Sequence, residues 1–172
     1  MITAANGKKA FLRIYKDNHV YPYESQISTA LKTLLQEAPM VGFVTGHKER
    51  SGMDMGEKGY GTFASNKTFR YSLENSGYGV REISLEHPVA EDINIIVISD
   101  MREWFTPKQE ANLQQYIDRG GNLFILGEPK RRDVMNNLFA KFGYEMTTGV
   151  LVKRDTNLQA DVILSYPTKE AD

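Results

Sequence analysis

A short apolar run at residues 40–45 is the feature that most constrains what this chain can fold into. Continuous apolar runs of this length are typical of strands buried on both faces, as in a parallel sheet. Two more runs of the same character occur at 94–99 and 122–126, and the first of these is the strongest central strand in the chain. Such strands need helices on both faces of the sheet that they form.

Segments with helical periodicity alternate with these strands. The strongest of them is 24–37, which Pro39 ends, and its predicted buried face is made of Ile27, Ala30, Leu31, Leu34 and Leu35. The sequence from Thr106 to Gln109 is typical of a capping box with proline at the first helical position, so a helix is expected up to Arg119. Two further helices are predicted at 66–75, capped by Ser65 and ended by Gly77, and at 133–142.

The remaining segments complete an α/β pattern. Further strands are predicted at 10–15, before a polar turn at 16–18, and at 80–85, 144–152 and 161–165, whereas the glycine-rich segment 46–61 is expected to be a long, mobile loop. The alternation predicts a three-layer α/β fold with a mostly parallel central sheet and helices on both faces. The predicted division is an N-terminal strand and turn at 1–22, an α/β core domain at 23–155 and a C-terminal strand and tail at 156–172.

Composition excludes several functional classes. With 21 Lys and Arg against 22 Asp and Glu, the net charge of −1 gives no field that would attract nucleic acid. The chain has no cysteine, which excludes thiol nucleophiles, thiolate metal sites and disulfides. No apolar run approaches the roughly 18 residues that a membrane span needs, and no signal-peptide pattern precedes the fold.

Polar residues follow three of the predicted strands. In an open parallel sheet the carboxyl ends of the strands meet at one edge, where ligands bind. A cleft lined by charges of both signs would suit a polar or zwitterionic ligand, but charged residues also populate ordinary solvated loops, and both interpretations stay open. The residues concerned are His47, Lys48, Glu49 and Arg50, then Asp100, Arg102, Glu103 and Trp104, then Glu128, Lys130, Arg131 and Arg132.

Signals for a particular chemistry are weak. His47 could act as a general base, or it could brace the loop by hydrogen bonding. The three histidines lack metal-ligand spacing, so no metal is expected. The chain has no GxSxG elbow, and the loop after residue 46 fits neither GxGxxG nor GxxxxGK[ST], so no nucleotide or other cofactor is expected.

Four segments resemble the extracytoplasmic domain of GldG-like proteins, which are auxiliary components of ABC-2-type transporters linked to gliding motility and export in Bacteroidetes. They are 23–31, 41–49 (Val-Gly-Phe-Val-Thr-Gly-His, then Glu49), 116–123 (Tyr-Ile-Asp-Arg-Gly-Gly-Asn-Leu) and 138–144. The pattern usual in that family at the end of the strand is Thr-Gly-His-Gly-Glu, and this chain has Lys48 in place of the second glycine. A side chain there would change any close approach of a ligand to the backbone.

The resemblance implies a flavodoxin-like or amidotransferase-like domain without established catalytic residues. It would lie outside the cytoplasmic membrane, tethered by transmembrane helices that belong to a longer protein. We therefore expect a non-catalytic binding or interaction module of an ABC-type transport system, with the permease and ATPase as partners and a carbohydrate or peptide as a conceivable ligand. The alternative is a hydrolase of the amidotransferase-like superfamily that uses His47 and Glu49 as an acid/base pair. The expected binding residues are His47, Glu49, Arg50, Asp100, Trp104 and Glu128.

Overall fold

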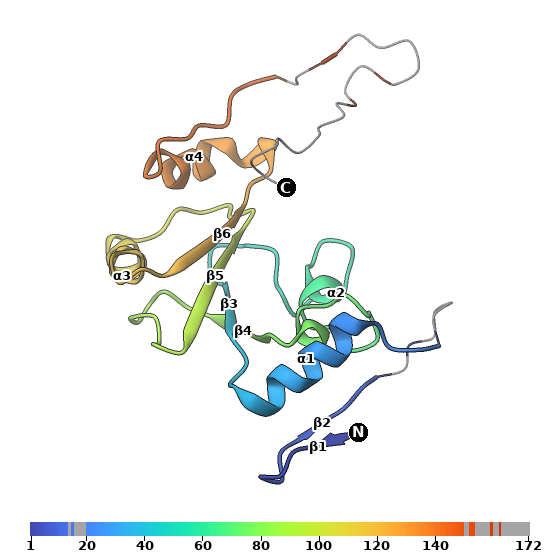
Figure 1. Ribbon diagram of the computed structural model, residues 1–172. Helices are drawn as coiled ribbons and strands as arrows, with labels where there is room; N and C mark the ends of the chain where they lie inside the picture. The colour runs from blue at the N-terminus through green and yellow to red at the C-terminus, as the bar shows by residue number, and fades with distance from the viewer. Residues whose placement is uncertain (14, 16–19, 150–151, 154–158, 160–161, 163–172) are drawn as a thin grey trace.

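The computed structural model of the protein describes residues 1–13, 15, 20–149, 152, 153, 159 and 162 (Figure 1). Within this part of the chain, four parallel strands form a sheet in the order β4-β3-β5-β6. The α/β fold with a parallel central sheet is thus confirmed. The strands are β3 (Met40–Val44), β4 (Gly79–Ile83), β5 (Ile93–Ser99) and β6 (Asn122–Leu126).

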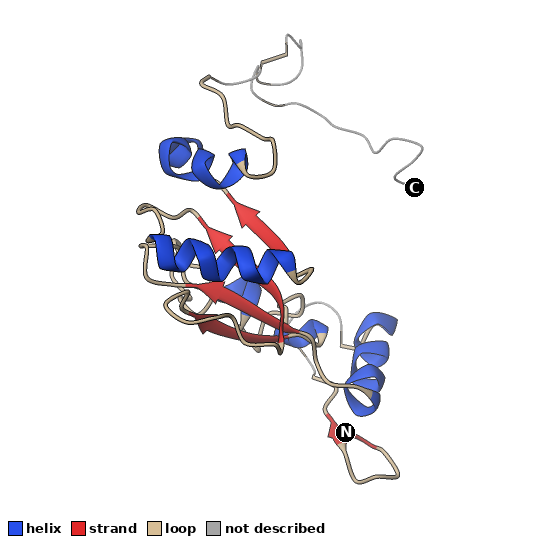
Figure 2. Ribbon diagram, turned by 90° about the vertical axis from the view of Figure 1, so that its left-hand side faces the viewer, coloured by secondary structure: helices blue, strands red, loops and turns tan. Residues whose placement is uncertain are grey.

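Helices lie on both faces of this sheet. The connection from β3 to β4 contains the short helix α2 (Gly61–Ala64) and the 3₁₀ turn η1 (Glu74–Ser76). The connection from β5 to β6 contains α3 (Pro107–Asp118), and β6 is followed by the 3₁₀ turn η2 (Pro129–Arg131) and by α4 (Arg132–Ala140). Figure 2, which views the molecule from the side of α3, shows this helix in front of the strands.

The side chains of β5 separate two cores, because successive residues of a strand point to opposite faces. Ile96 and Ile98 are buried in the larger core with residues of α3 and α4, such as Leu113. Val97 is buried in a smaller core on the α2 face, together with Phe43 of β3. The α2 face therefore has the thinner cover, since α2 is only four residues long.

The N-terminal segment differs from the prediction. A hairpin of two short strands, β1 (Ile2–Thr3) and β2 (Lys9–Ala10), stands in place of the strand predicted at 10–15, which is confirmed only at residue 10 and is wrong for the other described residues, 11–13 and 15. Because β1 is only two residues long, it offers no partner beyond Ala10, and Phe11 is exposed. The polar turn predicted at 16–18 lies outside the described residues.

Helix α1 (Glu24–Leu35) confirms the predicted helix but only part of its predicted buried face. Ala30 and Leu34 are buried against Ala10, because α1 packs on the hairpin and on η1. This support is narrow, so the other three apolar residues expected in the core are exposed: Ile27, Leu31 and Leu35.

The prediction of a helix at 66–75 is wrong, because local side-chain hydrogen bonds hold this segment in turns. The side chain of Asn66 accepts from the backbone N–H and the hydroxyl of Thr68, at 2.8 and 2.7 Å. The amide of Asn75 donates to the carbonyl of Phe69 at 2.7 Å. Such bonds compete with the helical ladder. Ser65 does not cap a helix here, but donates to the carbonyl oxygens of Gly52 and Gly61.

The strand predicted at 144–152 is also wrong for its described residues 144–149 and 152. Both the backbone N–H and the carbonyl of Met146 bond to the side chain of Asn136, at 2.8 and 3.2 Å, which ties the segment to α4 instead of the sheet. The strand predicted at 161–165 lies outside the described residues except for Val162. No helix in the described part of the chain is long and apolar enough to cross a membrane.

Candidate functional site

The site lies at the carboxyl ends of β3 and β5. These two strands are neighbours in the sheet, but the chain leaves β3 toward β4 on one side and leaves β5 toward β6 on the other. Such a point of reversal is where open α/β sheets hold their ligands. The loop after β3 supplies His47, Glu49 and Arg50, and the loop after β5 supplies Asp100 and Trp104.

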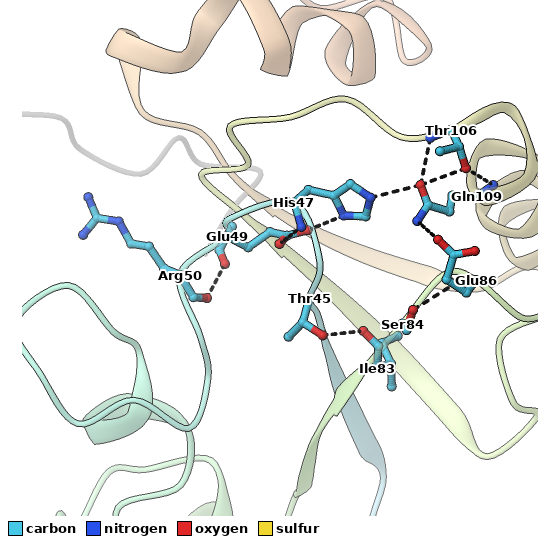
Figure 3. Close-up of polar contacts among 10 residues, drawn as sticks. Thr45, His47, Glu49, Arg50, Ile83, Ser84, Glu86, Thr106 and Gln109 are labelled. Carbon is cyan, nitrogen blue, oxygen red and sulfur yellow. Dashed lines mark hydrogen bonds and ion pairs between the residues drawn. The ribbon is translucent and has the colours of Figure 1, made fainter.

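His47 and Glu49 form a buried pair (Figure 3). The imidazole Nδ1 lies 2.8 Å from Glu49 Oε1, and the other carboxylate oxygen accepts from the backbone N–H of His47 at 2.6 Å. Only 6% of the His47 side chain and 2% of the Glu49 side chain are exposed. The Glu49 side chain therefore bonds to both the backbone and the ring of His47 in the same loop. The contact between the carboxylate and the imidazole is almost completely shielded from solvent.

Gln109 contacts the other end of the imidazole. Its Oε1 accepts from the backbone N–H of Thr106 at 2.8 Å and lies 3.0 Å from His47 Nε2, while its amide nitrogen donates to Glu86 Oε1 at 2.5 Å. Because the Gln109 oxygen is the acceptor for Thr106, the imidazole Nε2 must be the donor in this contact. We call His47, Glu49, Glu86, Thr106 and Gln109 the inner network; it joins the loops after β3 and β4 to the first turn of α3 (Figure 3).

A second group of charges lies around Arg50. Arg50 Nε is 2.8 Å from Asp100 Oδ2, and Arg50 Nη2 is 3.5 Å from Glu128 Oε2. The backbone of Arg50 is tied to the end of β5, since its N–H donates to the Ser99 carbonyl and its carbonyl accepts from the Ser99 hydroxyl at 2.7 Å. We call Arg50, Asp100 and Glu128 the outer cluster. Asp100 is buried, whereas Arg50 and Glu128 each keep about a third of the side chain exposed.

Tyr60 borders the outer cluster. Its hydroxyl donates to Asp100 Oδ2 at 3.4 Å. Burial is the main cause that raises the pKa of Tyr60 above its ordinary value, and the Asp100 carboxylate adds to the rise because a phenolate beside it would be repelled. Tyr60 therefore stays a neutral hydrogen-bond donor at physiological pH.

Two residues of the site have backbone conformations that side chains disfavour. Lys48 has φ of 60° and Asp100 has φ of 49°, both in the left-handed region. Lys48 forms an exposed ion pair with Glu103 at 2.5 Å, and the hydrogen bond from Lys48 lowers the pKa of Glu103. Backbone strain of this kind is concentrated in the two loops whose side chains form the site.

Five of the six predicted site residues therefore lie in the inner network or the outer cluster. Trp104 is the exception, since its ring packs on that of Phe105 at 5.2 Å, and Phe105 in turn meets the His47 ring edge-on at 4.8 Å. Gln109 and Glu86 were missed. The capping box predicts that the Gln109 side chain reaches back to Thr106, but nothing local predicts its contact with His47, and Glu86 carries no sequence signal.

The candidate reactive groups of the site are engaged in contacts with neighbouring residues. Both imidazole nitrogens of His47 have partners, so neither nitrogen faces an open cleft. The Ser99 hydroxyl donates to a backbone carbonyl instead of approaching a base. In the part of the chain that the structure describes, no three His, Asp or Glu side chains are grouped as metal ligands would be. The outer cluster offers an exposed cation between carboxylates, which can exchange these partners for a polar ligand or a partner protein.

The fold and the site define an α/β domain with a polar binding locus at the point where the strand order reverses. A sequence family described as an ABC-type uncharacterized transport system matches residues 38–165, which is most of the chain. The chain belongs to this family and is thus an auxiliary component of an ABC-type transport system. Comparisons with curated proteins and with solved structures gave no match.

Proposed function

We propose that the chain is a non-catalytic binding module of its ABC transport system and that it works on the extracytoplasmic side of the membrane, as the resemblance to GldG-like proteins suggests. The site in this proposal has two parts with different tasks. The inner network fixes the strand-end loops, and the outer cluster together with Trp104 meets the partner.

The observation that carries the proposal is the contrast in burial between the His47–Glu49 pair of the inner network and Arg50 of the outer cluster. His47, Glu49 and Gln109 of the inner network have buried side chains, and the imidazole has a partner at both nitrogens, which suits a support and not a reacting group. Arg50 is partly exposed, and its 3.5 Å contact with Glu128 is longer than its 2.8 Å contact with Asp100. A guanidinium held mainly from one side can offer its remaining N–H groups to a carboxylate or carbonyl of a partner.

The expected partners are the permease and the ATPase of the same system, since the family is defined by such a system. A cluster with charges of both signs also suits a carbohydrate or a peptide, whose hydroxyl or amide groups can bond to Arg50 and Glu128 together. Trp104 is only partly buried, so its ring can add an apolar contact beside the charges.

The proposal can be tested by co-purification of the chain, within its parent protein, with the permease and the ATPase. The variant Arg50→Ala should lower the recovered permease at least about tenfold, as expected for an arginine near the centre of an interface. The matched control is Arg81→Ala, because Arg81 of β4 is also a partly exposed arginine in an ion pair, here with Asp92. Equal recovery with both variants would show that the outer cluster is not the contact.

The hydrolase alternative has one observation in its favour, the contact of His47 with Glu49 at 2.8 Å. It requires His47 to release Gln109 and its Nε2 to lose the proton that it donates there, because only an unprotonated ring nitrogen can act as a base. Turnover of amide or ester substrates by the purified protein, abolished in His47→Gln while the protein stays folded, would replace the binding module with an enzyme. We expect no turnover that depends on His47.

A further inference from the structure

The two edges of the sheet differ in how they are protected against pairing with another strand. Edge strands with free backbone groups tend to pair with other chains, and charged residues counter this tendency. On β4, Arg81 forms an ion pair with Asp92 at 2.7 Å, and Glu82 bonds to the Ser51 hydroxyl. The sequence of β6 is Asn-Leu-Phe-Ile-Leu, with neither charge nor proline, and among the described residues only β5 pairs with it.

An apolar hollow of about 420 Å³ lies on the α2 face beside this unprotected edge. Its walls come from β3, β5, β6 and the α2 connection, and none of its lining residues is charged. Phe124 of β6 lines it and is 49% exposed, and Phe63 of α2 lines it from the other side and is 46% exposed. Within the described part of the chain, an unpaired strand edge and an exposed aromatic side chain thus occur together at β6.

We propose that two copies of this chain pair through β6, antiparallel and about a two-fold axis at Phe124. Residue 124 would lie opposite itself, 123 opposite 125, and 122 opposite 126. The side chains of Leu123 and Ile125 would continue the α3-face core across the axis, because both already pack against it. This proposal goes beyond the permease contact at the strand ends and does not depend on it.

A second copy is the occupant that the sequence of β6 fits. In a strand paired with itself, residues at equal distances from the axis lie opposite one another. The three central residues of β6 are all apolar, so they match when reversed, and only the two ends differ, with Asn122 facing Leu126. On the hollow face the two Phe124 rings become direct cross-strand neighbours, an arrangement that stabilises antiparallel pairs. Each ring then covers part of the hollow of the other copy. The exposed β4 edge, with its charges, would stay free at both ends of the continuous sheet.

The first experiment is to measure the mass of the protein in solution by sedimentation equilibrium over a range of concentrations. We expect a dimer that Phe124→Lys weakens at least about tenfold, since the new charge would lie against its own copy at the axis. Leu35→Lys is the matched control, because Leu35 is 83% exposed on α1 and lies outside β6. A wild-type protein that stays monomeric at about 100 μM, or a dimer that Leu35→Lys weakens as much, would overturn the proposal.

The second experiment uses the absence of cysteine in the chain, because a single introduced thiol then reports one contact. Opposite residues of an antiparallel pair have Cβ atoms about 4.5–5.5 Å apart, close to what a disulfide needs. Under mild oxidation Phe124→Cys should form a covalent dimer. Asn122→Cys and Leu126→Cys should not do so alone, but the two mixed together should, because residue 122 faces residue 126 of the other copy.

These outcomes separate the proposed pairing from other occupants of β6. If Asn122→Cys forms a dimer with itself as fast as Phe124→Cys, the antiparallel register is wrong. If no cysteine variant forms a dimer while circular dichroism shows all of them folded, a second copy does not occupy the edge, and a strand of another polypeptide replaces it as the candidate.

Discussion

His47 has partners at both ring nitrogens and along one side of its ring. Its ring touches Glu49 at one nitrogen and Gln109 at the other, and the edge-on contact with Phe105 excludes water from its flank. A buried imidazole with this many partners contributes to stability only while the partners are present, because a buried polar group left without a hydrogen bond is costly.

Replacement of Glu49 by glutamine should destabilise the protein by about 2 kcal/mol, since hydrogen bonds to charged groups contribute roughly 1.5–3 kcal/mol. The free energy of unfolding from urea titration is the measurement. Glu103→Gln is the control, because it removes a carboxylate from an ion pair that is largely exposed, and it should leave the free energy of unfolding nearly unchanged. Similar losses in both variants would mean that the His47 pair is no more than a surface contact.

Lys48 pays a conformational cost that glycine would avoid, because its φ of 60° is unfavourable for a residue with a Cβ. Lys48→Gly should raise the free energy of unfolding by up to about 1 kcal/mol, the left-handed strain being partly offset by the greater freedom of glycine in the unfolded chain. Lys48→Ala keeps the strain and loses the same ion pair with Glu103, so it should give no gain. A gain of equal size in both variants would place the cost in the lysine side chain and not in the backbone.

At the scale of elements, the sequence predicts those segments whose pattern comes from the sheet itself. The runs 40–45, 94–99 and 122–126 are strands, and the capping box at Thr106 opens α3 as expected. The failures at 66–75 and 144–152 come from asparagine side chains that bond to backbone groups, Asn66 and Asn75 in the first segment and Asn136 in the second, and periodicity does not show such contacts. The strand-end residues of the site could be predicted because each of them follows an apolar run along the chain. The contact of His47 with Gln109 could not be predicted, because it depends on how α3 packs beside the loop after β3.

Helix α1 shows how little of an apolar face a narrow support can bury. Leu34 of α1 is buried against the hairpin of β1 and β2, while its neighbour Leu35 is largely exposed. Leu34→Ala should lower the free energy that protects the α1 amides from exchange by about 2 kcal/mol or more. Leu35→Ala, the matched control, should change it by less than about 0.5 kcal/mol. The reverse order would indicate that the face predicted from periodicity, and not the hairpin contact, holds the helix.

At the scale of the whole molecule, the two faces of the sheet have unequal support. The α3 face carries the larger core with two helices, whereas the α2 face ends in an apolar hollow beside β6. Each core contains one tyrosine whose pKa burial raises, Tyr116 on the α3 face and Tyr60 near the outer cluster. Because of these two tyrosines, the free energy of unfolding depends on pH in the alkaline range.

The alkaline limb of the stability profile follows from these two shifts. In the folded state both phenols have a pKa above the ordinary value of 10.0, while in the unfolded state they return to it. Their neutral forms therefore stabilise the fold fully below about pH 10, and this contribution is lost as pH rises above 10 and through the folded pKa. Urea titrations from pH 8 to 11 should show stability falling above pH 10, with a shallower fall in the double variant Tyr60→Phe/Tyr116→Phe. The lysines titrate in the same range but are identical in both proteins, so an unchanged slope in the double variant would assign the alkaline loss to them instead.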